Sequence, residues 1–166
     1  IFILKLELSS KLTPRAESPM KIDAVNIEII KHLKDGRKSF RQIAEKLEVS
    51  ENTVRSRVNQ LTEAGILEIC GLVEPEALPG HRVAFVGVKL ASLNLVEKGK
   101  EFSKLRGVVS VSVVTGRFDL MLVVLLKEGF DLLEFYTQEV YRLKDVRAVE
   151  TFVVYKGYNL KVPYIL

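Results

Sequence analysis

Residues 39–67 constrain the fold most, because they predict two short helices joined by a tight turn. The first helix opens at Ser39, and the spacing from Ser39 to Gln42 is that of a capping box. The second opens at Ser50, a good N-cap, and ends at Gly65, a residue suited to the left-handed position that closes a helix. Only Glu48 and Val49 are left between the two helices, so the pair is expected to be compact.

The second helix, over residues 50–64, has one apolar side and one polar side. At about 100° per residue, Val54, Val58 and Leu61 fall together, and polar side chains fall opposite. Such a helix suits the major groove of DNA, where base edges offer hydrogen-bond donors and acceptors between rows of phosphates. The alternative is an ordinary helical hairpin in a core. The predicted DNA-binding residues are Asn52, Thr53, Arg55, Ser56 and Gln60 near the bases, Lys38, Arg41 and Arg57 on phosphate, and Ser50 at the start of the helix.

Charge supports a nucleic-acid partner only mildly, since the chain of 166 residues carries a net charge of +4. Between Lys31 and Lys46, six basic residues meet two acids, which fits either phosphate contact or a solvated face. The single cysteine, Cys70, excludes an internal disulfide and a cysteine-based zinc site, which fits a reducing cytoplasm. We therefore expect a cytoplasmic protein that has no metal and no cofactor.

The N-terminal part of the chain predicts a small helical domain. Residues 1–20 read as an arm that pairs with another subunit or as a non-native extension, and Lys5 interrupts their apolar run too early for a membrane span. Residues 21–34 carry a helical apolar stripe that Asp35 and Gly36 end. Residues 66–73 are strand-like, as a small wing would be. Residues 21–73 are thus predicted to form a winged helix-turn-helix domain, and the Pro- and Gly-rich residues 74–81 to form a hinge.

From residue 82 the hydrophobic period changes, and residues 82–166 predict a second domain. Strands are expected at 82–90, 107–115, 118–126 and 147–155, and helices at 95–105 and 130–143. This βαββαβ order is the ferredoxin-like unit, with both helices on one face of the sheet, so the fold class is α+β.

The strand at 118–126 is apolar without a break over residues 120–126, and its residues point to both faces of the sheet. A strand that is apolar on both sides is usually buried on both sides, so a second copy is expected to cover the face without helices. Such a dimer would bring two reading helices to one palindromic DNA site. The apolar tail, residues 158–166, is expected to pack across that junction.

Together these features resemble the Lrp/AsnC, or feast/famine, family of transcriptional regulators, whose C-terminal domain is of the RAM or ACT-like type. The resemblance covers residues 21–155 and rests on the helix-turn-helix pattern and on Thr115-Gly116 followed by Phe118-Asp119. The helix-turn-helix positions that match are Ser50, Val54, Arg57, Val58, Leu61, Gly65, Ile66 and Leu67.

The resemblance implies homodimers that associate further into tetramers, octamers or larger discs, and an amino acid as a small-molecule effector. Carried onto this chain, it places the effector site at Thr115, Gly116, Arg117 and Asp119. Gly116 would let backbone N–H groups approach a carboxylate, and Asp119 would pair with an α-ammonium group. The alternative is a plain hairpin turn with Asp119 as its capping partner. Arg117 stands where the family often has an acidic or other polar residue.

The function expected from these patterns is sequence-specific regulation of transcription without enzymatic activity. One alternative is an enzyme similar to the sirohaem decarboxylases of the same family, although the only histidines are His32 and His81 and no catalytic set presents itself. Another alternative is an architectural protein that compacts DNA with little sequence choice, which a steep salt dependence would reveal.

Overall fold

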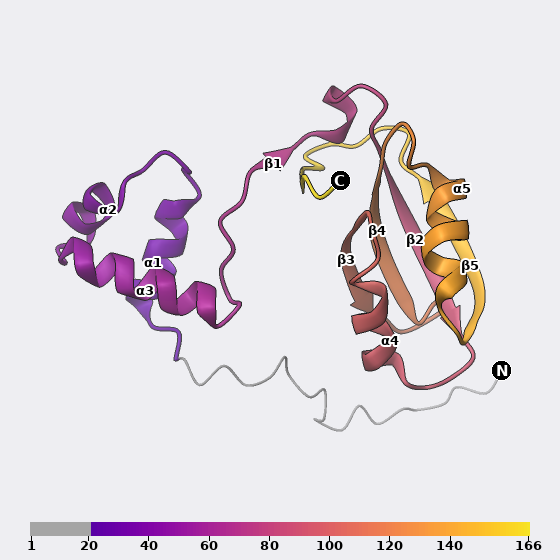
Figure 1. Ribbon diagram of the computed structural model, residues 1–166. Helices are drawn as coiled ribbons and strands as arrows, with labels where there is room; N and C mark the ends of the chain where they lie inside the picture. The colour runs from indigo at the N-terminus through magenta and orange to yellow at the C-terminus, as the bar shows by residue number, and fades with distance from the viewer. Residues whose placement is uncertain (1–20) are drawn as a thin grey trace. The chain divides into compact units, whose positions relative to one another are not determined.

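The computed structural model describes residues 21–166, which form two compact units that divide between Ile69 and Cys70 (Figure 1). The expected N-terminal arm, residues 1–20, lies outside the described residues. Within the part that is described, no helix is both long enough and apolar enough to cross a membrane.

The first unit contains three helices, α1 (Ala24–Leu33), α2 (Phe40–Leu47) and α3 (Glu51–Glu63). Helix α2 begins with the predicted capping box, because the Ser39 and Gln42 side chains each accept from the other's backbone N–H. Helix α1 begins at Ala24, later than the predicted residue 21, because the Asp23 side chain caps it by accepting from the Asn26 N–H. The core of this unit consists of Ile29, Ile43, Ala44, Val54 and Val58.

The wing expected over residues 66–73 does not form a strand along its length. Strand β1 (Leu72–Val73) is the only strand there, and it pairs with β6 (Val162–Pro163) within the second unit. Gly65, at φ +64°, ends the helix, and Glu68, Ile69, Cys70 and Gly71 then run exposed. Strand-forming residues need a partner for their backbone groups, and only the C-terminal segment supplies one here.

The second unit is a four-stranded antiparallel sheet in the order β3-β4-β2-β5, with its helices on one face (Figure 1). Along the chain come the short 3-10 turn η1 (Pro75–Ala77), β2 (Arg82–Leu90), α4 (Leu95–Phe102), β3 (Val108–Val113) and β4 (Leu120–Leu126). A helical segment follows, divided into α5 (Leu132–Glu134), the π-helical turn η2 (Phe135–Glu139) and the 3-10 turn η3 (Val140–Arg142), and then β5 (Val146–Val153). The predicted α+β fold class is confirmed.

The last helix begins at Leu132 rather than at the predicted residue 130. The Asp131 carboxylate caps it by accepting from the Leu133 and Glu134 N–H groups. Phe130 instead turns into the core, where it is fully buried and meets Phe135 edge to face. The helix-covered face of the sheet therefore holds the main core, which includes Val86, Leu122 and Phe102.

The opposite face of the sheet is only partly covered. At one end Val162, from the C-terminal tail, packs against Val83 and Leu125, so the tail packs on its own chain's sheet rather than only across a junction with another copy. At the other end Phe118 lies over Gly87, where an added Cβ would come within 2.6 Å of the ring. Phe118 meets Phe152 edge to face, and Phe152 remains 45% exposed. An apolar area on this face is thus left open to solvent.

Candidate DNA interface and ligand-binding residues

The polar side of α3 forms one exposed surface in the first unit. Val54, Val58 and Leu61 are buried on the opposite side, as the sequence predicted. Six of the predicted DNA-binding residues together line a shallow depression on this surface: Ser50, Asn52, Thr53, Ser56, Arg57 and Gln60. The Ser50 hydroxyl holds the start of the helix, since it accepts from the Thr53 N–H at 3.1 Å. Donors and acceptors with this placement suit the edges of bases.

The three remaining predicted DNA-binding residues are cations, and each makes a weak contact with a neighbouring side chain. Arg55 pairs with Glu51 at 2.7 Å and lies over the Phe40 ring, while Arg41 pairs with Glu45 at 3.1 Å. Lys38 Nζ lies 3.3 Å from His32 Nδ1. Exposed pairs of this kind contribute little to stability, so a phosphate or a base can replace the partner at small cost. Their contacts with DNA stay a prediction.

Arg57 differs from these residues because it is tied into its own unit. Its Nη1 atom donates to both carboxylate oxygens of Asp23, at 2.8 and 2.7 Å, and to Asn26 Oδ1 at 2.8 Å. The pKa of Asp23 is lowered, first by the Asn26 N–H and then by Arg57. Arg57 therefore joins α3 to the start of α1, and its predicted contact with phosphate stays a prediction.

The turn between β3 and β4 carries the predicted effector residues. Thr115, Gly116 and Arg117 are exposed, and Gly116 has φ +112° with open space where a side chain would be. Arg117 Nη2 lies 2.6 Å from a Glu150 carboxylate oxygen. The turn is therefore accessible, and its backbone is free to approach a ligand closely.

Asp119, the remaining effector candidate, already has partners for both oxygens. Oδ1 accepts from Lys89 Nζ at 2.7 Å, and Oδ2 accepts from the Leu90 N–H at 2.8 Å. The Lys89 hydrogen bond, followed by that of the Leu90 N–H, lowers the pKa of Asp119. Both contacts are with the end of β2 rather than with the turn, so the carboxylate ties the start of β4 to β2 and does not cap the 115–117 turn. Its pairing with an α-ammonium group stays a prediction.

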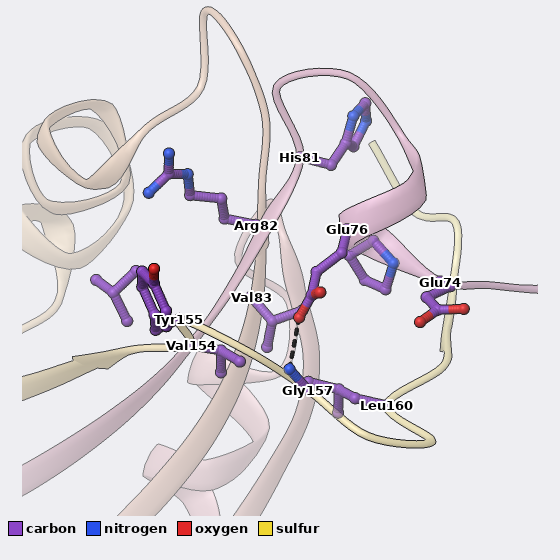
Figure 2. A pocket seen from close by; sticks show the side chains of 11 residues that line it. Glu74, Glu76, His81, Arg82, Val83, Val154, Tyr155, Gly157 and Leu160 are labelled. Carbon is purple, nitrogen blue, oxygen red and sulfur yellow. Dashed lines mark hydrogen bonds between the residues drawn. The ribbon is translucent and has the colours of Figure 1, made fainter.

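A pocket that the sequence did not reveal lies in the second unit, with a volume of about 380 Å³ (Figure 2). It is lined by residues from the predicted hinge, from β2 and from the segment that follows β5, among them Glu74, Arg82 and Tyr155. No spacing rule connects such distant segments, so only the tertiary structure brings these side chains together. Across residues 21–166, no three His, Cys, Asp or Glu side chains gather as a metal-ligand set.

The two units together define a class of protein that combines a DNA-binding helix-turn-helix with a ligand-binding β-sheet domain. Residues 22–68 match the sequence family described as winged helix-turn-helix DNA-binding, and residues 83–161 match the Lrp/AsnC ligand binding domain. The chain therefore belongs to the Lrp/AsnC family of transcriptional regulators, which confirms the resemblance seen in the sequence.

Individual proteins agree with this assignment. The HTH-type transcriptional regulator Ptr1 of Methanocaldococcus jannaschii is 30% identical over 140 residues, which cover 83% of this chain and 95% of that protein. The regulator FL11 of Pyrococcus furiosus is 29% identical over 136 residues, which cover 81% of this chain and 88% of that protein. These relatives are transcriptional regulators, so the chain is a regulator rather than an enzyme.

Solved structures show the same fold. E. coli AsnC has a TM-score of 0.64 at 21% identity, over 85% of this chain and 97% of that one. The regulator NMB0573 from Neisseria meningitidis, solved as a complex with L-Met, has a TM-score of 0.62 at 23% identity, over 88% of this chain and 96% of that one.

Proposed function

We propose that this regulator recognises a specific DNA sequence through the exposed polar side of α3. The observation that carries the proposal is the gathering of Asn52, Thr53, Ser56 and Gln60 on one exposed surface, while the apolar side of the same helix is buried. Amide and hydroxyl groups discriminate base edges in the major groove, and Arg55 adds a donor that guanine accepts well. Lys38, Arg41 and Arg57 would contact phosphate, which adds affinity without sequence choice. A regulator of this kind meets its DNA in the cytoplasm.

The proposal includes a homodimer that forms through the open face of the sheet. Phe118 and Phe152 leave an apolar area there that none of the described residues covers, and a second copy's sheet is the simplest cover. A two-fold dimer would present two copies of α3 to half-sites about 34 Å, or one turn of DNA, apart. Larger assemblies of such dimers would extend the same contacts.

The proposal also includes a small-molecule effector, an amino acid or a similar metabolite, at the turn between β3 and β4. The match to a ligand-binding domain supports an effector, and the Neisseria relative was solved with L-Met. Gly116 leaves the turn open for a carboxylate, and Thr115 offers a hydroxyl group. Binding of an α-ammonium group at Asp119 would require sharing or displacing the Lys89 contact.

Selection of bound sites from random DNA, with and without a pool of amino acids, tests this proposal. We expect a palindromic motif, and we expect the double variant Arg55→Ala and Ser56→Ala to lose it while the oligomer stays intact. The matched control Arg142→Ala and Ser103→Ala removes the same residue types from exposed positions of the second unit and should keep the motif. Footprints that survive the α3 double variant would refute the assignment. Salt-sensitive binding with no motif would instead indicate an architectural protein.

A further inference from the structure

The pocket shown in Figure 2 lies at the opposite end of the sheet from the proposed effector turn. Arg82 begins β2, whereas Asp119 contacts Leu90 at the end of that strand. Eight residue steps of about 3.3 Å separate the two ends by about 26 Å. All the lining residues belong to the second unit, so the pocket does not depend on how the units are arranged. It is therefore a separate cavity.

A brace formed by Glu76, Lys156 and Gly157 connects two segments on one wall of the pocket. Glu76 Oε2 accepts from Lys156 Nζ at 2.6 Å, and Glu76 Oε1 accepts from the Gly157 N–H. The Lys156 hydrogen bond, followed by that of the Gly157 N–H, lowers the pKa of Glu76, so the brace is charged at neutral pH. These contacts link the 3-10 turn η1 to the segment after β5 and use the hydrogen-bonding capacity of Glu76 within the protein.

Two other charged residues on the walls have no such partners. Neither the Arg82 guanidinium nor the Glu74 carboxylate makes a hydrogen bond or an ion pair with any residue between 21 and 166, although the charge of Glu74 helps to raise the pKa of Lys156. Figure 2 shows Arg82 on one side of the pocket, next to Tyr155, and Glu74 on the other side, with Glu76, Val83 and Val154 between them. Val83 is 3% exposed, and Pro75 and Leu160 add further apolar surface. The pocket thus has a positive end, an apolar floor and a negative end.

This arrangement selects among classes of ligand. A simple anion would satisfy Arg82 but would lie in the field of Glu74 and Glu76, and a simple cation would leave Arg82 unpaired. A molecule with a carboxylate at one end, an ammonium at the other and methylene groups between them would pair with both charges through charge-assisted hydrogen bonds. The volume, about 380 Å³, is at the small end of the range for ligand pockets and suits a metabolite.

We propose that this pocket binds a small linear zwitterion, with its carboxylate on Arg82, its ammonium on Glu74 and its apolar chain over Val83 and Val154. This site goes beyond the proposed function, because it lies away from the Thr115–Asp119 turn and does not require DNA binding. It gives the ligand-binding domain a second place at which a metabolite can act.

Isothermal titration of the full chain with 6-aminohexanoate, hexanoate and hexylammonium tests the proposal. We expect 6-aminohexanoate to bind at least about ten-fold more tightly than either single-charge probe, since each of those forms only one charged contact. Arg82→Gln and Glu74→Gln should each weaken binding by about ten-fold or more, to the level of the single-charge probes. The charge exchange Arg82→Glu with Glu74→Arg should restore much of the affinity, because the zwitterion can bind in the reverse direction.

The matched control is Arg117→Gln, which changes the proposed effector turn and should leave 6-aminohexanoate affinity unchanged. Loss of binding in this variant but not in Arg82→Gln would place the probe at the turn and overturn the proposal while leaving the effector site intact. Equal binding of hexanoate, or no binding of any probe by the wild-type chain, would also overturn it. A change in sedimentation of Arg82→Gln without probe binding would show that the pocket is a contact between subunits instead.

Discussion

The guanidinium of Arg57 joins two helices of the DNA-binding unit through a single nitrogen atom. Its partners are the Asp23 carboxylate and the Asn26 amide oxygen, and Asn26 is only 1% exposed. Removal of a partner from a buried polar group costs more than the hydrogen bond itself gains, because the group stays out of water. Arg57 thus holds α3 against the start of α1, and we expect the orientation of the polar side of α3 to depend on this contact.

Arg57→Ala is expected to lower the free energy of unfolding of this unit by about 1–3 kcal/mol, because the Asn26 amide oxygen loses its partner. Hydrogen exchange of the α1 amides would measure the loss within this unit alone. The control Arg41→Ala removes an exposed arginine from a pair 80% and 64% exposed, and it should change stability by less than about 0.5 kcal/mol. An Arg57→Ala variant as stable as the control would show that this contact does not hold the helices together.

The contribution of Asp119 to the stability of the fold is expected to depend on pH. Its pKa is lowered below the ordinary 3.8 in the folded chain, first by the Lys89 hydrogen bond and then by the Leu90 N–H. A lowered folded pKa means that the carboxylate stabilises the fold above the ordinary pKa, and that this stability is lost as the pH falls through the lowered value. Asp119→Asn should therefore cost about 1–2 kcal/mol at pH 7, and the difference from wild type should shrink at pH values below 3.8.

Unfolding by urea at a series of pH values would measure this difference. The control Glu128→Gln neutralises an exposed carboxylate of the same unit, and it should leave stability nearly unchanged at each pH. A constant difference between Asp119→Asn and wild type down to pH 2 would mean that the charge of Asp119 does not contribute.

At the scale of the element, the two serines of the α3 region are expected to have separate roles. Ser50 caps the helix from outside it, whereas Ser56 lies on the exposed surface within the helix. Ser50→Ala should cost about 1 kcal/mol of stability. Ser56→Ala should change stability by less than about 0.5 kcal/mol and should instead weaken binding to the selected DNA site. Thermal unfolding and DNA titration of both variants would check this separation. Equal effects of the two variants on both quantities would contradict it.

The elements that the sequence predicted well are those whose signals are local. Caps at Ser39 and Ser50 and an apolar stripe at Val54, Val58 and Leu61 define the helices of the first unit, and β2 has the bounds that the sequence predicted. Local signals do not predict an element or a contact that depends on a partner distant in the sequence. Leu72–Val73 becomes a strand only because the C-terminal tail pairs with it, and the Arg57 contact with Asp23 joins residues 34 positions apart.

The same difference between local signals and contacts of distant segments applies to the candidate sites. The polar surface of α3 comes from one helix, so helical spacing alone could predict its members. The pocket near Arg82 comes from three segments, and its charged ends, Arg82 and Glu74, are brought together only by the path of the hinge over the sheet. For Asp119 two interpretations follow from the sequence, and its bond to Lys89, which is 30 positions away, could not be predicted from spacing.

At the scale of the whole molecule, one end of the open face of the sheet is covered by the chain itself and the other end is exposed. The chain's own tail covers the end near Val83 and Leu125. The end near Phe118 and Phe152 has no such cover among the described residues. A dimer contact is therefore expected to centre on the two phenylalanines, where aromatic side chains contribute most per residue.

Phe152→Arg is expected to dissociate the dimer, because the substitution places an unpaired charge in an apolar interface. Sedimentation velocity should show monomers for this variant and dimers or larger species for the wild type. Tyr141→Arg is the matched control, since Tyr141 is 86% exposed on the helical layer, away from the open face, and this variant should keep the wild-type assembly. The dissociated variant should also lose affinity for a palindromic site far more than for a single half-site, because two linked copies of α3 bind with a higher effective concentration. Monomers in the wild type, or dimers in Phe152→Arg that match those of Tyr141→Arg, would mean that the open face is not the contact and that α3 meets DNA in some other arrangement.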